Sequence, residues 1–172
     1  MRTMFSLVLA AAVSTLVVSN ASGAEPMGEA PSTGEILAKL HRSNLKEIQM
    51  GQMAQDHGTL KDVKAFGATL VKDHTDADTK VSKLAKEKNI DLTVNSLPVE
   101  PSNLPMGAGF DAAFARDMVE DHRKDIAEVE DAKSRTRDAQ LKKLLAGLLP
   151  VLKKHEEIAQ KLVQQTNKSA SR

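Results

Sequence analysis

The sequence predicts an all-α protein, a four-helix bundle in which one long crossover joins the second helix to the third. Apolar residues recur at spacings of three and four through four long segments, which places them on one face of each helix. Prolines and glycines gather between the second segment and the third. The other two connections are only a few residues long, so each joins antiparallel neighbours.

The first helix is expected over residues 33–55. Its core-facing positions carry apolar side chains, but they also include Glu47 and Gly51. Gly58 follows as a natural left-handed stop. The buried face of this helix is therefore expected to be mixed rather than purely apolar.

The second helix is expected to start at Thr59, which with Asp62 three residues later resembles a capping box. His74 lies inside its apolar stripe. Residues 89–109 then hold three prolines and two glycines, which predicts a connection rather than a helix. At ~3.1 Å per residue this connection could reach roughly 60 Å. A helix of about 27 residues is only ~40 Å long, so the connection can run the full length of the bundle.

The third and fourth helices are expected over residues 110–133 and 138–165, with a short turn between them. His122 lies in the stripe of the third helix and His155 in that of the fourth. Pro150 removes a backbone hydrogen bond from the fourth helix and should kink it. Four helices with one long connection in the middle form the ferritin-like arrangement.

The two ends of the chain are expected to lie outside this domain, which spans residues 34–165. Residues 1–24 have a positive start, an apolar run and small residues before Ala24, as a secretory signal peptide does. The competing interpretation is a membrane anchor, but a spanning helix needs ~20 apolar residues and polar side chains interrupt this run. Residues 25–33 read as a flexible linker and residues 166–172 as a disordered tail.

Composition narrows the range of functions. Cleavage near Ala24 would remove one arginine and no acid, leaving 23 basic and 23 acidic residues. A neutral, mixed surface gives no reason to expect nucleic acid as a partner. Cysteine is absent, which excludes a thiol nucleophile and a cysteine-ligated metal. No segment of the mature chain is apolar enough to span a membrane.

The candidate site consists of polar residues on the four buried stripes. At 1.5 Å per residue they fall in the middle third of the bundle, within about 12 Å of one another. Three imidazoles and one carboxylate suit one divalent ion such as zinc, iron, copper or nickel. The candidate metal ligands are Glu47, His74, His122 and His155.

A second interpretation of the same residues is a metal-free polar network that holds the helix register. Asp73 and Asp121 point away from the neighbouring histidines, but either could orient an imidazole of another helix. Asp78 and Asp125 are helical neighbours that could supply a carboxylate. No role is expected for the two remaining histidines, His41 and His57.

Motifs for catalysis are lacking in the sequence. No serine follows a strand-to-helix elbow, and no glycine-rich loop precedes a helix in a phosphate-binding pattern. We therefore expect no catalytic or organic-cofactor residues, and a protein that is not an enzyme.

Several motifs together resemble a known family. They are VKAFGATLVKDHTDA, FDAAFARDMVEDHRKDIAEVEDA and LLPVLKKHEEIAQKL, with the preceding Glu47, Gly51 and Ala54. The chain is similar to the exported bacterial proteins of the domain of unknown function 4142, often labelled "predicted outer membrane protein". The resemblance implies a ferritin-like bundle in the bacterial envelope, without an established activity. Because no lipidation cysteine is present, we expect a soluble protein of the periplasm.

The di-iron centres of ferritin-like proteins use Glu-x-x-His on two helices. Here Val71 and Leu152 stand three residues before His74 and His155, so a mononuclear site is the better metal hypothesis.

The function predicted first is a non-enzymatic binding or stress-related envelope protein with a buried Glu/His cluster. The alternative is a metal-binding protein for storage, sensing or redox work. A third hypothesis is an interaction module with an exposed apolar patch at Leu45, Ile48 and Leu149. Such residues could also join copies of the chain into a homo-oligomer.

Overall fold

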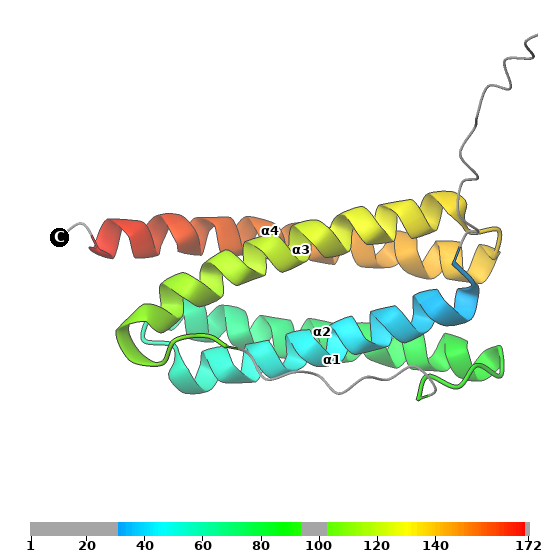
Figure 1. Cartoon of the computed structure of the whole chain (residues 1–172), viewed down its shortest axis with the longest axis horizontal. Coiled ribbons are helices and arrows are strands. Elements are labelled where there is room, and N and C mark those ends of the chain that lie inside the picture. Colours follow the sequence, from blue (N-terminus) through cyan, green and yellow to red (C-terminus); the bar gives the residue numbers. More distant parts are fainter. Residues whose placement is uncertain (1–30, 94–102, 171–172) are drawn as a thin grey trace, which may run out of the picture.

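The computed structural model describes residues 31–93 and 103–170. It contains four long helices, as predicted, and a short 3₁₀ turn before the third of them (Figure 1). The predicted signal peptide and residues 25–30 of the linker lie outside the described residues, as do residues 171–172 of the tail. The helices are α1 (Thr33–His57), α2 (Lys61–Glu87), α3 (Phe110–Arg135) and α4 (Ala139–Ala170), and the turn is η1 (Gly107–Gly109).

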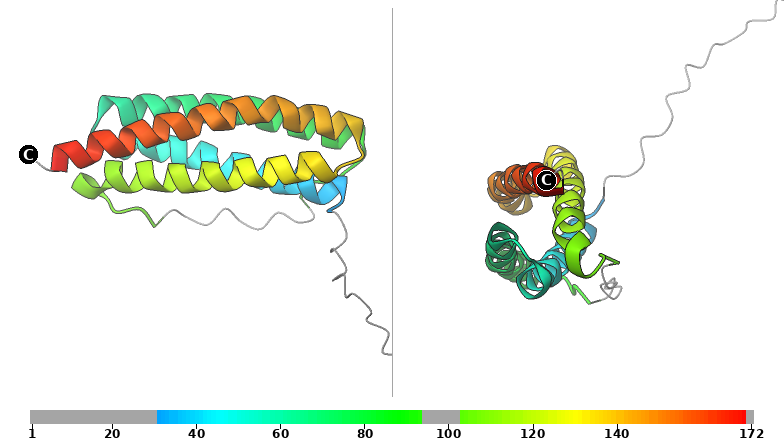
Figure 2. Two further views of the ribbon diagram at one scale, coloured as in Figure 1. Left: turned by 90° about the horizontal axis from the view of Figure 1, so that it is seen from above. Right: turned by 90° about the vertical axis from the view of Figure 1, so that its left-hand side faces the viewer.

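The helices form two antiparallel hairpins, α1 with α2 and α3 with α4. The end view shows the hairpins stacked so that α1 lies beside α3 and α2 beside α4 (Figure 2). The two short turns lie at opposite ends, and α3 begins at the end of the bundle opposite to the one at which α2 ends. The all-α four-helix bundle with its central crossover is therefore confirmed.

Two apolar clusters fill the interior, one toward each end. The first surrounds Leu37, Val81 and Leu145 near the α3–α4 turn. The second contains Phe66 and Phe114 near the α1–α2 turn. Because the apolar stripes of all four helices contribute to both, hydrophobic burial holds the hairpins together. The middle of the bundle, between the clusters, is where the stripes carry polar residues.

Glycines allow α1 and α2 to approach closely. A Cβ on Gly51 would lie 2.6 Å from the carbonyl oxygen of Gly67, and one on Gly67 would lie 2.5 Å from that of Gly51. Such contacts are shorter than any side chain tolerates, so the crossing requires the absence of a Cβ on both helices. This explains why a glycine stands on the buried face of α1.

The predicted start of α2 is wrong. Lys61 is its first residue, and no side chain caps it, so Thr59 and Asp62 form no capping box. Instead the carboxylate of Asp111, from the first turn of α3, accepts the backbone N–H groups of Thr59 and Leu60, each at 2.9 Å. It also accepts the Thr59 hydroxyl. A tertiary partner has taken the place of the local cap.

Gly58 ends α1, but it is not the predicted left-handed stop. Its φ is −59° and its ψ is 138°, which is extended backbone open to any residue. Glycine is needed here for a steric reason, because a Cβ at this position would lie 2.5 Å from the carbonyl oxygen of Ala54. The start of α1 is satisfied locally by Ser32 and Glu35, which form a capping box.

α4 continues to Ala170, five residues beyond the predicted end. The predicted disordered tail is therefore wrong for residues 166–170. The added turn has tertiary support, since Gln165 Nε2 donates to Asp62 at 3.1 Å and Thr166 is buried. Pro150 lies inside α4, which is helical on both sides of it.

The predicted exposed apolar patch does not form as expected. Leu45 is 38% exposed, but Leu149 is 7% exposed and belongs to the first apolar cluster. In the described part of the chain, none of the helices combines the length and apolarity needed to cross a bilayer.

Candidate metal centre

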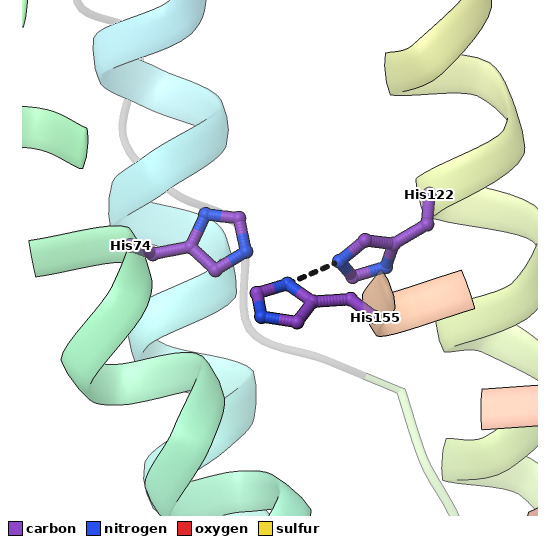
Figure 3. A group of neighbouring side chains, drawn as sticks. All are labelled: His74, His122 and His155. Atoms are coloured by element: carbon purple, nitrogen blue, oxygen red, sulfur yellow. Dashed lines mark hydrogen bonds between the residues drawn. The ribbon is translucent and has the colours of Figure 1, made fainter. Parts of the chain in front are cut away.

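Three histidines from three helices meet in the middle of the bundle (Figure 3). His74 on α2, His122 on α3 and His155 on α4 form what we call the histidine cluster. One ring nitrogen of each lies within 4.8 Å of the others, and His122 Nε2 is 3.2 Å from His155 Nδ1. The side chains are 3%, 1% and 1% exposed, respectively. The helical spacing that places them on the stripes thus brings them to one point in space.

The nitrogen of each ring that faces away from the cluster is held by an oxygen. Because these oxygens only accept hydrogen bonds, each outward nitrogen carries the proton. The neutral rings therefore turn unprotonated nitrogens toward one another. The acceptors are Asn44 Oδ1 for His74, the Met118 carbonyl for His122 and the Asp73 carboxylate for His155, at 3.0, 2.9 and 3.1 Å.

Burial keeps the cluster uncharged. It lowers the pKa of His74 to about 3 and that of His122 to about 4, with repulsion from a protonated His155 adding to both effects. Burial also lowers the pKa of His155, against the opposing effect of its hydrogen bond to Asp73. Near neutral pH all three imidazoles are neutral, which is the state that binds metal ions.

Glu47, the predicted carboxylate ligand, is buried on α1 but is not one of the residues that converge within 4.8 Å. Burial, helped by the negative charges of Asp121 and Asp125, raises its pKa to about 8. Its Oε2 has no hydrogen-bond partner among the described residues. Near neutral pH Glu47 is therefore a buried carboxylic acid rather than an anionic member of the cluster.

Of the two aspartates that precede a histidine, Asp73 orients an imidazole, as the sequence allowed. It belongs to α2 but holds His155 of α4. Asp121 instead pairs with Lys46 at 2.6 Å.

The other two carboxylates that the sequence singled out have partners outside the cluster. Asp78 pairs with His41 at 2.7 Å, and Asp125 accepts the hydroxyl of Ser43 at 2.5 Å. His41 therefore has a partly buried hydrogen-bond partner, where no role was expected.

Sequence reasoning missed two acceptors, Asn44 and the Met118 carbonyl. Asn44 lies on the buried stripe of α1, and a polar residue there was the signal that could have found it. The Met118 carbonyl stands one helical turn before His122, a position from which a main-chain oxygen can reach the ring of the following histidine. Neither acceptor belongs to the residue types usually searched for metal ligands.

The chain was also compared with known proteins. The sequence profile of the family described as "Domain of unknown function (DUF4142)" matches residues 18–162. The chain belongs to this family. No match was found among curated proteins or among solved structures. Because the family description assigns no activity, the function of this DUF4142 protein has to be inferred from the site.

The arrangement has the chemistry of a first coordination shell with its supporting hydrogen bonds. Ligating histidines usually donate their other N–H to a carboxylate, a backbone carbonyl or another oxygen, which fixes the tautomer and aims the lone pair. The three rings of this DUF4142 protein show all three kinds of support. Two ligands of a tetrahedral ion with ~2.0 Å bonds lie about 3.3 Å apart, close to the 3.2 Å between His122 Nε2 and His155 Nδ1.

Proposed function

We propose that this protein is an exported protein of the bacterial envelope that binds one divalent transition metal ion through the histidine cluster. The observation that carries the proposal is the orientation of the rings: outward nitrogens held by oxygens, and inward nitrogens turned toward one point. The signal-like residues 1–24 support export to the periplasm. Three protein ligands leave one coordination position open, so the site is not a closed structural one.

The contact between His122 and His155 argues for a cation in the cluster. With both outward nitrogens protonated, their facing nitrogens at 3.2 Å present two lone pairs to each other. Two lone pairs at this distance repel unless a positive charge lies between or beside them. A metal ion would satisfy both, and it would also satisfy His74 Nε2, which has no partner among the described residues.

The nature of the ligands narrows the choice of metal. Imidazole nitrogen suits zinc, copper, iron and nickel, whereas calcium and magnesium take oxygen ligands. The protonated Glu47 adds no negative charge near neutral pH. We therefore expect zinc, copper or nickel to bind more tightly than the harder ions.

The competing interpretation is a metal-free network in which His122 and His155 share one proton. A separation of 3.2 Å is at the long end of the hydrogen-bond range, and Asp73 would balance part of the charge. This interpretation leaves His74 Nε2 unpaired, and it places a proton on rings whose pKa burial lowers.

Elemental analysis of the protein, purified without a polyhistidine tag, tests the proposal. We expect close to one transition metal ion per chain, and little in the double variant His74→Ala/His122→Ala. The matched control is His41→Ala/His57→Ala, which also removes two histidines but leaves the cluster intact.

Thermal unfolding of the wild type provides a readout that does not depend on the variants folding. A ligand at 100 times its dissociation constant stabilises the native state by about 2.7 kcal/mol, which would raise the melting temperature by several degrees. No bound metal in the wild type, together with no thermal shift from zinc, iron, copper or nickel, would leave the metal-free network as the better account.

A further inference from the structure

We propose that a neutral, elongated apolar molecule with one hydrogen-bond acceptor at its end binds in the cavity beside the histidine cluster. The cavity has a volume of about 530 Å³ and is lined by residues of all four helices. Small-molecule sites commonly occupy ~300–1,000 Å³. This space therefore has the size of a ligand site rather than that of a packing defect.

The cavity extends along the bundle as an apolar channel. On α1 its lining runs from Glu35 to Asn44, a rise of about 14 Å at 1.5 Å per residue. It opens to solvent between exposed residues such as Lys39, Lys80 and Val151. Its walls are mainly aliphatic, with Ile36, Leu40, Val129, Leu145, Leu148 and Leu152 among them. An extended hydrocarbon chain matches these walls.

One residue that lines the cavity carries a buried hydrogen-bond donor without a partner among the described residues. Asn44 and His74 both line it, and Asn44 is 6% exposed. The Asn44 oxygen is engaged by His74 Nδ1 at 3.0 Å, whereas its Nδ2 has no partner among the described residues. A buried donor without a partner is costly. Because Nδ2 is itself buried, a small shift of the Asn44 side chain toward the cavity would let it donate to an acceptor at the end of the ligand.

The surroundings of the cavity disfavour an anionic ligand. Five lining residues are acidic and two are lysines. Three of the acids are in ion pairs, Glu128 with Lys39, Asp73 with Lys72 and Asp131 with Arg135. A carboxylate or phosphate head would lie near the remaining acids and, above all, would have to shed its water in an apolar channel. A carbonyl or ether oxygen accepts the Asn44 N–H without either cost. The acidic residues are Glu35, Asp73, Asp125, Glu128 and Asp131.

Occupancy of the cavity does not require the metal. The proximity of the ligand's acceptor to a bound ion does rest on the proposed function, because His74 is both a lining residue and a member of the cluster. If both hold, ligand and metal binding are coupled through His74, and each changes the affinity for the other by the same factor.

The test uses the neutral dye N-phenyl-1-naphthylamine, whose fluorescence rises in apolar sites, with metal-free and with zinc-supplemented protein. Ala77→Phe fills the cavity from α2, and Ala68→Phe is its control on the same helix, at an exposed position outside the cavity. We expect dye affinity to fall at least about tenfold, or 1.4 kcal/mol, in Ala77→Phe only. Equal dye binding by the wild type and both variants would overturn the proposal.

Competition against the bound dye tests the end group. We expect 2-decanone to displace the dye more strongly than either decane or decanoate does. Asn44→Asp, which keeps an oxygen for His74 but removes the amide donor, should abolish the advantage of the ketone over decane. Displacement by decanoate as strong as that by 2-decanone would overturn the proposed ligand class.

The two proposals fail in different ways. Dye binding that Ala77→Phe abolishes, in a protein that takes up no metal, would support the cavity and contradict the metal site. If the protein takes up metal but Ala77→Phe does not change its affinity for the dye, the result would contradict the proposed cavity ligand. It would not contradict the metal site.

Discussion

Each histidine of the cluster occupies a position where the helical pattern would otherwise place an aliphatic side chain. His74 follows Leu70 at the same spacing by which Leu70 follows Phe66, and all three are buried. A leucine there would bury more apolar surface and need no partner, whereas the imidazole leaves Nε2 unpaired among the described residues. A metal ion bound to the inward nitrogens would offset the free-energy cost of this buried, unpaired nitrogen. This is the physical argument for a ligand at the cluster.

The hydrogen bond from His155 to Asp73 should matter more for metal affinity than for folding. Asp73→Asn keeps the shape but weakens the acceptor that fixes the ring tautomer. We expect metal affinity to fall roughly 10- to 100-fold, measured by competition with a chelator of known affinity. Asp76→Asn, which alters an exposed partner of Lys72, is the control. Equal losses in the two variants would contradict the role given to Asp73.

The stability of the metal-free protein should fall as the solution is acidified. In the unfolded chain histidine titrates near 6.5, whereas burial lowers the pKa of His74 to about 3 and that of His122 to about 4. Between these values the unfolded chain binds protons that the native cluster does not, so stability is lost as the pH falls from about 6.5 toward 4.

Melting temperatures from pH 7 to pH 4 measure this effect. The double variant His74→Leu/His122→Leu should lose most of the dependence, because its core has nothing to protonate at these two positions. If the melting temperature of this variant fell with pH as steeply as that of the wild type, other groups would be responsible for the acid sensitivity.

Glu47 should show the opposite dependence. Its pKa is about 8 in the native state against an ordinary value of 4.5. Between these values the native state keeps a proton that the unfolded state loses, so this residue costs increasing stability as the pH rises. Glu47→Gln should stabilise the protein by roughly 1–3 kcal/mol near pH 7 and have little effect near pH 4.5. Chemical denaturation at several pH values measures this stabilisation. If Glu47→Gln stabilised the protein equally at all of them, the raised pKa of a buried, unpaired Glu47 carboxyl would be contradicted.

At the level of single helices, the sequence predicted the stripes and the starts of α1 and α3 correctly, but not the start of α2 or the end of α4. Stripes depend on the helical period, which is local, whereas an end depends on which partner satisfies the free backbone groups. The N–H groups of Thr59 and Leu60 find Asp111, some fifty residues away. No pattern near Thr59 could indicate that partner, so the local capping box appeared the better solution.

The close crossing of α1 and α2 predicts that glycines in this fold differ sharply in their tolerance of substitution. Gly51→Ala would place a Cβ 2.6 Å from the Gly67 carbonyl oxygen, a backbone atom that cannot move without shifting the helix. We expect a loss of about 1–3 kcal/mol. At Gly147 a Cβ meets nothing within 4 Å, so Gly147→Ala should gain up to about 1 kcal/mol from helix propensity. Urea unfolding of both variants measures the contrast, and similar effects would contradict it.

For the whole molecule, the sequence predicted that the polar stripe residues lie at similar depths, and the three histidines do meet. It could not predict that Glu47 lies outside their group, because depth along an axis says nothing about rotation and offset between hairpins. Those offsets are set by the packing of two apolar clusters against each other. The cavity could not be predicted from the sequence either, because it is a space between the four helices rather than a property of any single helix.

The position of the cluster predicts how a bound metal would change the dynamics of the bundle. His74 belongs to one hairpin, and His122 and His155 belong to the other, so a shared ion would join the hairpins directly. Hydrogen exchange should then slow in the middle of α2 as well as in the middles of α3 and α4 when zinc is added, because separating the hairpins would require release of the ion.

The matched control for this measurement is His41→Ala/His57→Ala, which should respond to zinc as the wild type does. Protection confined to α3 and α4 would show that zinc is held by His122 and His155 alone and that the hairpins still open independently. Protection in all three helices would show that the bound ion holds the two hairpins together. Loss of the ion would then destabilise the same helices that form the walls of the cavity.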